Sequence, residues 1–527
     1  MPARRALFDR WTLGFVLLSV ALVWVRIVAL RLSPLDLHFD EAQYWAWSQS
    51  FELGYFSKPP LIAWVIAATT ALVGDAEWGV RLAAPIAHGL GALALYALGR
   101  NLYGAAAGFW AGLTWLLLPA VSLSSFVMST DALVLPLWSF ALLALWRLVA
   151  TRSWFWAVLL GVAVGAGALA KYAMLYFPLC ALLATWWAKP VREALLGPRG
   201  IVAALIALAI LSPNLYWNFT HGFETVAHTA SNASLTSDLF HPGEMLEFAL
   251  NQGLVIGPIF LVLFVWLLSR AARHGSTLQD ADRFLLAFVI PPLAVILVQA
   301  FLSRANANWA AAAYPAAVVW LCGNLIATKA MRRWLAGATF ANVLLGALFI
   351  STTVDPAIPS QVVTAFNNLT GLHVRTPRGQ REATHWEETA REIAIRARGE
   401  PGEAPFTAVL VDHRAAYFEL AYYWRHARRS GAPLPPVRMW LLTDAARNSA
   451  EAGDPMRPEE GARVLVVHMT PKYLPLVAGD FTVFRAVEHL SVPLDGGATR
   501  ELDISVGESF APAVRDEAYL LRVRELN

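Results

Sequence analysis

Two adjacent carboxylates and a lysine stand close together near the start of the chain, among aromatic residues. Asp40 and Glu41 lie in His38-Phe-Asp-Glu-Ala-Gln-Tyr-Trp-Ala-Trp47, and Lys58 lies in Gly54-Tyr-Phe-Ser-Lys-Pro-Pro60. Both segments follow the first long apolar run, and charged groups at the edge of a bilayer are costly to place. A carboxylate can accept the proton of an attacking hydroxyl, and a cation can stabilise a departing phosphate. The pattern therefore indicates chemistry on a substrate that itself lies in the membrane.

Other candidate groups lie at the ends of later apolar runs. Asp131 can act as a second base, whereas Lys171 and Arg304 can join Lys58 in balancing the charge of a phosphate, arginine by a two-pronged contact. A metal is not required, because these cations already offset the phosphate charge. Five further residues are candidates for substrate binding: Tyr44, Tyr55, Tyr172, His228 and Asn308.

Each of these residues also has a purely structural explanation. Asp40, Glu41 and Asp131 can cap the N-termini of helices. Lysines beside a membrane can extend toward lipid head groups, and Arg304 can mark a helix end. The aromatic residues can belong to the belts found at membrane interfaces. The functional interpretation therefore depends on whether the charged residues share one side of the membrane.

The composition is typical of an integral membrane protein. Of the 527 residues, 57% are hydrophobic and only 15% are charged, against about 25% charged in a soluble domain. The formal net charge of +3 and the absence of a basic block with interleaved aromatic residues argue against nucleic-acid binding. Cys180 and Cys322 both lie in apolar runs and predict buried hydrophobic side chains rather than a disulfide or metal cluster.

Long apolar runs predict the membrane-spanning helices. The first is expected to remain uncleaved, because it is too long for a signal peptide. The shorter run 61–73 predicts an interfacial helix within a first loop that extends over 32–81. About eleven spans are predicted, near 11–31, 82–100, 106–126, 131–150, 154–170, 173–188, 200–216, 248–269, 283–302, 308–328 and 333–351.

The distribution of positive charge indicates the orientation. If the arginine-rich segment 4–10 is cytoplasmic, alternating loops place most of the later loop arginines and lysines on that same side, as the positive-inside rule expects. Counting 61–73 as a span would remove this bias. The outer side then holds candidate residues of both charges: Asp40, Glu41, Lys58, Asp131, Lys171 and Arg304.

The composition changes near residue 352. Charge rises, and short apolar strands alternate with helical patterns: 407–412 predicts a strand followed by a helix over 414–425, and 462–468 with 471–477 repeats the pattern. The segment 519–524 predicts a last strand. We therefore expect a transmembrane domain over 1–351 and a small extracytoplasmic α/β domain over 352–527.

The first loop resembles the bacterial branch of the protein O-mannosyltransferase family, GT-C glycosyltransferases that include the lipid A aminoarabinose transferases. The resemblance covers roughly residues 10–330 and is most specific in the two segments of the first loop. Looser matches follow: Glu77-Trp-Gly-Val-Arg-Leu82, Ser129-Thr-Asp131, Gly167-Ala-Leu-Ala-Lys-Tyr172, Ser212-Pro-Asn-Leu-Tyr-Trp-Asn218, Asn308-Trp309 and Ala313-Tyr-Pro315.

The resemblance implies a polyprenyl-phosphate-linked sugar donor and an inverting transfer at the periplasmic face of the bacterial inner membrane. It places the catalytic aspartate at Asp40, the second acid at Asp131, and the lysines that hold the lipid phosphate at Lys58 and Lys171. The aminoarabinose transferases have a glutamate, associated with a bound metal, where this chain has Ser57. That difference argues against both a metal and aminoarabinose in this chain.

The sequence thus predicts a polytopic α-helical GT-C membrane protein with an extracytoplasmic α/β domain, acting as a monomer. The expected acceptor is lipid A, lipopolysaccharide or another envelope glycolipid, and a protein acceptor is the alternative. A transporter or flippase for a lipid-linked substrate would place charges near the bilayer midplane and show paired broken helices. A structural scaffold would leave the clustering of charges on one side unexplained.

Overall fold

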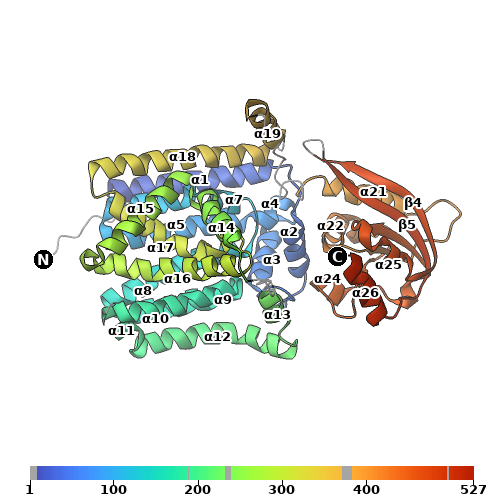
Figure 1. Cartoon of the computed structure of the whole chain (residues 1–527), viewed down its shortest axis with the longest axis horizontal. Helices are drawn as coiled ribbons and strands as arrows, with labels where there is room; N and C mark the ends of the chain where they lie inside the picture. The colour runs from blue at the N-terminus through green and yellow to red at the C-terminus, as the bar shows by residue number, and fades with distance from the viewer. Residues whose placement is uncertain are drawn as a thin grey trace. The chain divides into compact units, whose positions relative to one another are not determined.

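The computed structural model describes residues 9–187, 189–231, 239–355, 357–370, 383–494 and 498–526. The chain forms two compact units (Figure 1). One unit comprises Met1–Ser33 with Glu52–Val354, and the other comprises Pro34–Phe51 with Asp355–Asn527. A short piece of the first loop therefore belongs to the same unit as the C-terminal part of the chain.

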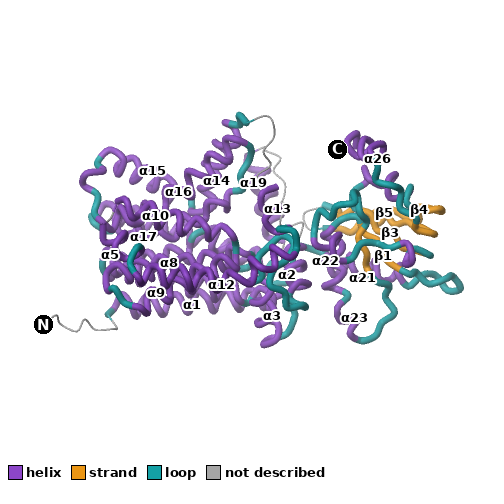
Figure 2. The backbone as a smooth tube through the Cα atoms, turned by 90° about the horizontal axis from the view of Figure 1, so that it is seen from below, coloured by secondary structure: helices purple, strands orange, loops and turns teal. Residues whose placement is uncertain are grey.

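The described regular elements of the first unit are all helices, whereas the described strands all lie in the second (Figure 2). Six of its described helices are long and apolar enough to cross a membrane, or seven with a bent pair counted as one span. The predicted total of about eleven spans remains a prediction. The long helices are α1 (Arg10–Leu32), α4 (Glu77–Arg81) with α5 (Ala83–Tyr103), α8 (Thr130–Thr151), α12 (Pro198–Thr220), α16 (Asp280–Leu302) and α18 (Lys329–Val354).

Shorter helices occupy the remaining apolar runs and the connections between them. The run 61–73 forms a helix of its own, α3, as expected. These elements are α3 (Leu61–Val73), α6 (Ala105–Leu117), α7 (Pro119–Ser124), α9 (Trp154–Ala170), η1 (Tyr172–Leu175), α10 (Tyr176–Trp187), α11 (Lys189–Leu195), α13 (Glu224–Ser231), η2 (Gly275–Thr277), η3 (Ala307–Ala313) and α17 (Tyr314–Leu325).

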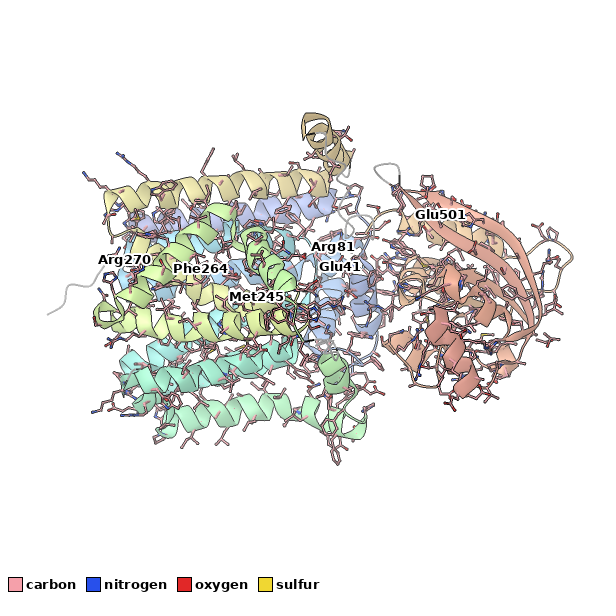
Figure 3. The ribbon with its side chains drawn as sticks, in the orientation of Figure 1. Glu41, Arg81, Met245, Phe264, Arg270 and Glu501 are labelled. Carbon is pink, nitrogen blue, oxygen red and sulfur yellow. The ribbon has the colours of Figure 1, made fainter. Side chains whose placement is uncertain are left out.

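A sharp bend replaces the continuous span predicted over 248–269. The chain bends by 116° between helices α14 (Pro242–Ile256) and α15 (Pro258–Arg273) (Figure 3, where Met245 lies on α14 and Phe264 and Arg270 on α15). Gly257 joins them with φ of +97°, a left-handed conformation that other residues adopt only with strain. Asn342 of α18 donates a hydrogen bond of 3.0 Å to the carbonyl of Ile256, which satisfies an acceptor at the end of α14.

A second interruption falls inside the span predicted over 106–126, where α6 ends and α7 begins at Pro119. Arg26 of α1 is buried against this break. Its guanidinium donates to the carbonyl of Leu116 and to the hydroxyl groups of Ser125 (2.9 Å) and Ser122 (3.1 Å). A cation inside a membrane-spanning helix is thus used to satisfy acceptors near the end of another helix.

The second unit contains a five-stranded sheet in the order β2-β1-β3-β5-β4. Strands β1 (Ala408–Val411), β2 (Val437–Met439) and β3 (Arg463–His468) are parallel, with Val409 opposite both Val437 and Leu465. The hairpin of β4 (Phe481–Pro493) and β5 (Thr499–Phe510) adds two antiparallel strands. The predicted strands at 407–412 and 462–468 and the helix after the first are therefore confirmed.

The prediction of a last strand over 519–524 is wrong, because this segment is helix α26 (Glu517–Leu526). Tyr519 and Val523, four residues apart, share one helix face and pack into the core of the unit. The carboxylate of Asp516 accepts a hydrogen bond of 2.9 Å from the backbone N–H of Tyr519 and caps the helix. The apolar residues of so short a segment fit both the two-residue period of a strand and the spacing of a helix. The N-cap at Asp516 decides in favour of the helix.

The second unit also contains helices, one of which is formed by the first-loop segment. In particular, α2 (Phe39–Trp47) packs on α22, where the edge of the Trp45 ring meets the ring of Tyr422 at 5.0 Å. The other helices are α19 (Ala357–Thr370), α21 (Trp386–Ala397), α22 (Arg414–Tyr423), α23 (Arg425–Arg429), α24 (Ser449–Gly453), η4 (Pro458–Glu460), η5 (Pro471–Tyr473) and α25 (Leu474–Ala478).

Candidate active site

Asp40 is presented by the first turn of α2. His38 is the N-cap, and its Nδ1 accepts a hydrogen bond of 3.2 Å from the backbone N–H of Asp40. The carboxylate of Glu41 accepts a hydrogen bond of 3.0 Å from the backbone N–H of His38 and completes a capping box. Glu41, labelled in Figure 3, is buried and its carboxylate is used in this cap, whereas the side chain of Asp40 is 41% exposed. Asp40 is therefore the acid of this pair that solvent or a substrate can reach.

The carboxylate of Asp40 is held by an arginine from the C-terminal part of the same unit. Arg414 Nη2 lies 3.0 Å from Asp40 Oδ1. Arg414 Nη1 donates a hydrogen bond of 2.7 Å to the side-chain oxygen of Gln43, one turn along α2. The amide nitrogen of Gln43 in turn donates 3.2 Å to the hydroxyl of Ser449. One guanidinium thus bridges two side chains on one face of α2.

Three predicted residues meet at one place in the first unit. Lys171 Nζ lies 2.8 Å from Asp131 Oδ1, and the amide of Asn308 donates 2.8 Å to Asp131 Oδ2. Asp131 lies in the first turn of α8, which is capped by Ser129, so the structural alternative in which Asp131 itself is the N-cap does not hold. Because an ammonium group has three donors, Lys171 can hold an anion while it remains paired with Asp131.

The loop that carries Lys58 is fixed by the motif 212–218 of α12. The side-chain amide of Asn214 donates a hydrogen bond of 2.8 Å to the carbonyl of Leu53. Its oxygen accepts a hydrogen bond of 2.8 Å from the hydroxyl of Tyr172. Gly54 lies so close to the ring of Trp217 that a Cβ atom would stand 2.5 Å from it. The matched motif thus links the Lys58 loop to the segment that follows Lys171.

Tyr55 and Lys58 close a tight turn in this loop. The backbone N–H of Tyr55 donates a hydrogen bond of 3.1 Å to the carbonyl of Lys58. The hydroxyl of Thr225 donates a hydrogen bond of 2.7 Å to the carbonyl of Tyr55. Burial raises the pKa of Tyr55 to about 12, so its phenol remains protonated at neutral pH and can donate a hydrogen bond. The side chain of Lys58 is half-buried.

The other predicted residues have less defined surroundings. Arg304 is exposed after the end of α16, and Tyr44 is buried in α2. His228 lies in α13, but its side chain is outside the described residues. Neither Lys58 nor Arg304 is a partner of Asp131 in the described part of the chain. Within the same described ranges, no group of three or more His, Cys, Asp or Glu side chains is arranged to hold a metal ion.

Comparison with known proteins indicates the family to which this chain is similar. Residues 57–217 match the family model of dolichyl-phosphate-mannose-protein mannosyltransferases. The lipid A galacturonosyltransferase RgtD of Rhizobium johnstonii is 38% identical over 313 residues, which are 59% of this chain and 64% of that protein. This chain is a relative of the ArnT-like GT-C glycosyltransferases. The family resemblance predicted from the first loop is confirmed.

A further curated relative and a solved structure are also similar to this chain. The undecaprenyl phosphate-alpha-4-amino-4-deoxy-L-arabinose arabinosyl transferase 1 of Pseudomonas fluorescens is 28% identical over 317 residues, 54% of this chain and 55% of that protein. The chain therefore spans less than two thirds of the length of these relatives. The crystal structure of ArnT from Cupriavidus metallidurans bound to undecaprenyl phosphate superposes with a TM-score of 0.60 at 17% identity, covering 93% of this chain and 98% of that one. This likeness shows a shared fold.

Two residues that contact the candidate residues or their loop were not predicted. Arg414 has no motif around it, and only its place directly after a buried parallel strand, where ligand sites of α/β sheets gather, distinguishes it. Asn214 lies within the matched segment 212–218, but its contact with the first loop joins positions 161 residues apart in the sequence. Neither contact can be read from local spacing.

Proposed function

We propose that this protein is an integral membrane glycosyltransferase that moves a monosaccharide from a polyprenyl phosphate to lipid A, lipopolysaccharide or another envelope glycolipid. The observation that carries the proposal is the Lys171 ammonium, held by Asp131 and Asn308 beside the end of an apolar helix. Such a fixed cation suits a lipid-linked phosphate. The names of the relatives supply the same chemistry: lipid A in one and undecaprenyl phosphate in the other.

In the proposed reaction, the hydroxyl oxygen of the acceptor attacks C1 of the sugar while the bond from C1 to the phosphate oxygen breaks. Asp40 accepts the proton of the hydroxyl, since its carboxylate is partly exposed at the first turn of α2. Lys58 and Lys171, with Arg304, stabilise the negative charge that grows on the departing phosphate. Attack from the side opposite the phosphate inverts the configuration at C1.

The proposed location is the bacterial inner membrane, with a cytoplasmic N-terminus and the C-terminal α/β domain in the periplasm. The apolar helices of the first unit support a multi-pass membrane protein. The sidedness follows from the distribution of arginine and lysine. We propose that the protein acts as a monomer. A topology assay with reporters fused after residues 151 and 273, both expected inside, tests this orientation.

No step of the proposed mechanism uses a metal ion. Ser57 supplies a hydroxyl at the position where the resemblance to the aminoarabinose transferases implies a glutamate. Cations already neutralise the phosphate in this proposal. Sugar transfer is therefore expected to be unchanged by a chelator, and loss of transfer that added Mg²⁺ or Zn²⁺ restores would contradict this expectation.

The test is sugar transfer by the purified protein in liposomes that contain lipid A and a polyprenyl-phosphate sugar. Galacturonic acid is the first sugar to try, because the relative that is 38% identical is named for it. Asp40→Asn should abolish transfer, while Asp75→Asn, in the loop before α4, should leave it unchanged. Transfer at the wild-type rate by Asp40→Asn would remove Asp40 from its role.

A protein acceptor is the second candidate, supported by the description of the matching family model. Mass spectrometry of lipid A and of envelope proteins, from cells with and without the gene, separates the two. A sugar missing from lipid A supports the first candidate, whereas a sugar missing from peptides supports the second. Movement of the intact donor across the bilayer without transfer would instead support a flippase.

A further inference from the structure

The strongest unassigned feature is the guanidinium of Arg414, which contacts the residue proposed as the base. Arg414 is the first residue of α22, directly after the turn that follows β1. A cation in the first helical turn lies at the unfavourable, partly positive end of the helix. At this position the arginine does not stabilise α22 through the helix dipole. A partner outside the helix offsets the unfavourable charge interaction. That partner is Asp40.

The guanidinium is fixed from three sides. Arg414 Nη2 reaches Asp40 Oδ1 at 3.0 Å, Nη1 donates 2.7 Å to Gln43, and the guanidinium carbon lies 4.6 Å from the centre of the Phe39 ring. Gln43 is itself buried and donates 3.2 Å to Ser449. The planar fork of arginine engages the acid and the amide at the same time through two different nitrogens in a fixed geometry.

The arrangement leaves the second oxygen of the carboxylate outside this contact. Asp40 Oδ2 lies 4.0 Å from His38 Nδ1, beyond hydrogen-bond distance. The carboxylate is oriented through Oδ1 and presents Oδ2. The ion pair is also partly exposed, with 34% of the arginine side chain and 41% of the aspartate side chain accessible. An ion pair at such exposure contributes little to stability.

We propose that Arg414 is a positioning residue for Asp40, which fixes the orientation of the carboxylate so that one oxygen faces the acceptor hydroxyl. The inference rests on the proposed function, in which Asp40 is the base. Through α22 and the turn after β1, the C-terminal part of the chain then contributes to catalysis by orienting the base. Gln43 braces Arg414 and thereby acts one step further from the reaction.

The experiment measures kcat, the KM for the polyprenyl-phosphate sugar and the melting temperature of the full chain. Arg414→Gln should lower kcat about 10- to 100-fold, because a misplaced base loses its reactive geometry. The KM for the donor should stay within about two-fold, and the melting temperature within about 3 °C. Arg414→Lys should recover part of kcat, and Gln43→Leu should lower it by about three-fold.

Arg396→Gln is the matched control, because Arg396 of α21 also forms an ion pair with another element of this unit, at Glu488 of β4, besides a pair with Glu392 within its own helix. It should leave kcat unchanged. If Arg414→Gln retains the wild-type kcat while Asp40→Asn is inactive, this inference is wrong and the proposed function stands. If Arg414→Gln instead lowers the melting temperature together with kcat and raises KM, the residue is structural and the inference is also wrong. A wild-type protein that transfers no sugar overturns both.

Discussion

Lys171 and Asp131 form an ion pair of 2.8 Å between the end of α9 and the first turn of α8. Both side chains are largely but not fully buried, at 24% and 16% exposure. The second carboxylate oxygen is occupied by Asn308. Each oxygen of the acid therefore has a protein donor, and the ammonium group, with three donors, retains donors for a ligand. In this pair the acid orients the lysine, and the lysine is the group available to a phosphate.

Removal of the lysine should impair the use of the donor. Lys171→Met is expected to lower kcat/KM for the polyprenyl-phosphate sugar about 100-fold, because a preorganised cation is lost where charge develops. Asp131→Asn should cost less, since an amide can still accept a hydrogen bond from the lysine. Steady-state transfer assays measure both variants. Lys189→Met is the control, because Lys189 is exposed and pairs only loosely with Glu193 at 3.8 Å.

Helix positions and the acids of the first loop could be predicted from the sequence, because apolar run length and local spacing determine them. Partners could not. Gln43 and Arg414 are 371 residues apart, and nothing local at Arg414 indicates its contact. The bend at Gly257 was missed because the apolar run continues through it, and only a positive φ and the amide of Asn342 reveal it.

The buried cation of α1 should be important for stability rather than for catalysis. Arg26→Met removes the donors to Leu116, Ser122 and Ser125 at the break between α6 and α7. We expect the free energy of unfolding to fall by about 3 kcal/mol, because buried acceptors lose a charged donor. Thermal unfolding in detergent measures this. Arg273→Met, at an exposed helix end, should have little effect, and equal stability of the two variants would contradict the assignment.

The hairpin of β4 and β5 carries an exposed histidine that should make its local stability depend on pH. His489 lies between Asp503 (2.7 Å) and Glu501 (2.8 Å), and the hydrogen bond to Asp503 is the main cause that raises the pKa of His489 above its usual value of 6.5. Because the folded pKa is the higher one, the stabilisation is complete below about pH 6.5. It is lost as the pH rises through the raised pKa.

Amide hydrogen exchange across the hairpin, followed from pH 5.5 to 8.5 and corrected for intrinsic rates, measures this loss of protection. Titration of the His489 ring by NMR gives its pKa directly. Asp503→Asn should return that pKa toward 6.5 and flatten the pH dependence of protection in β4. A ring that titrates at 6.5 in the unaltered protein would show that the two carboxylates do not hold it in solution.

The packing of Gly54 should control the position of Lys58. In Gly54→Ala the new methyl group would lie 2.5 Å from the Trp217 ring and 2.9 Å from Asn214, so the loop must shift. Because this loop carries Lys58 four residues later, we expect kcat/KM for the donor to fall about ten-fold. Gly337→Ala is the matched control, since nothing lies within 4 Å of its added methyl and alanine favours a helix. It should retain full activity, and equal activity of both variants would show that the Gly54 contact does not position the lysine.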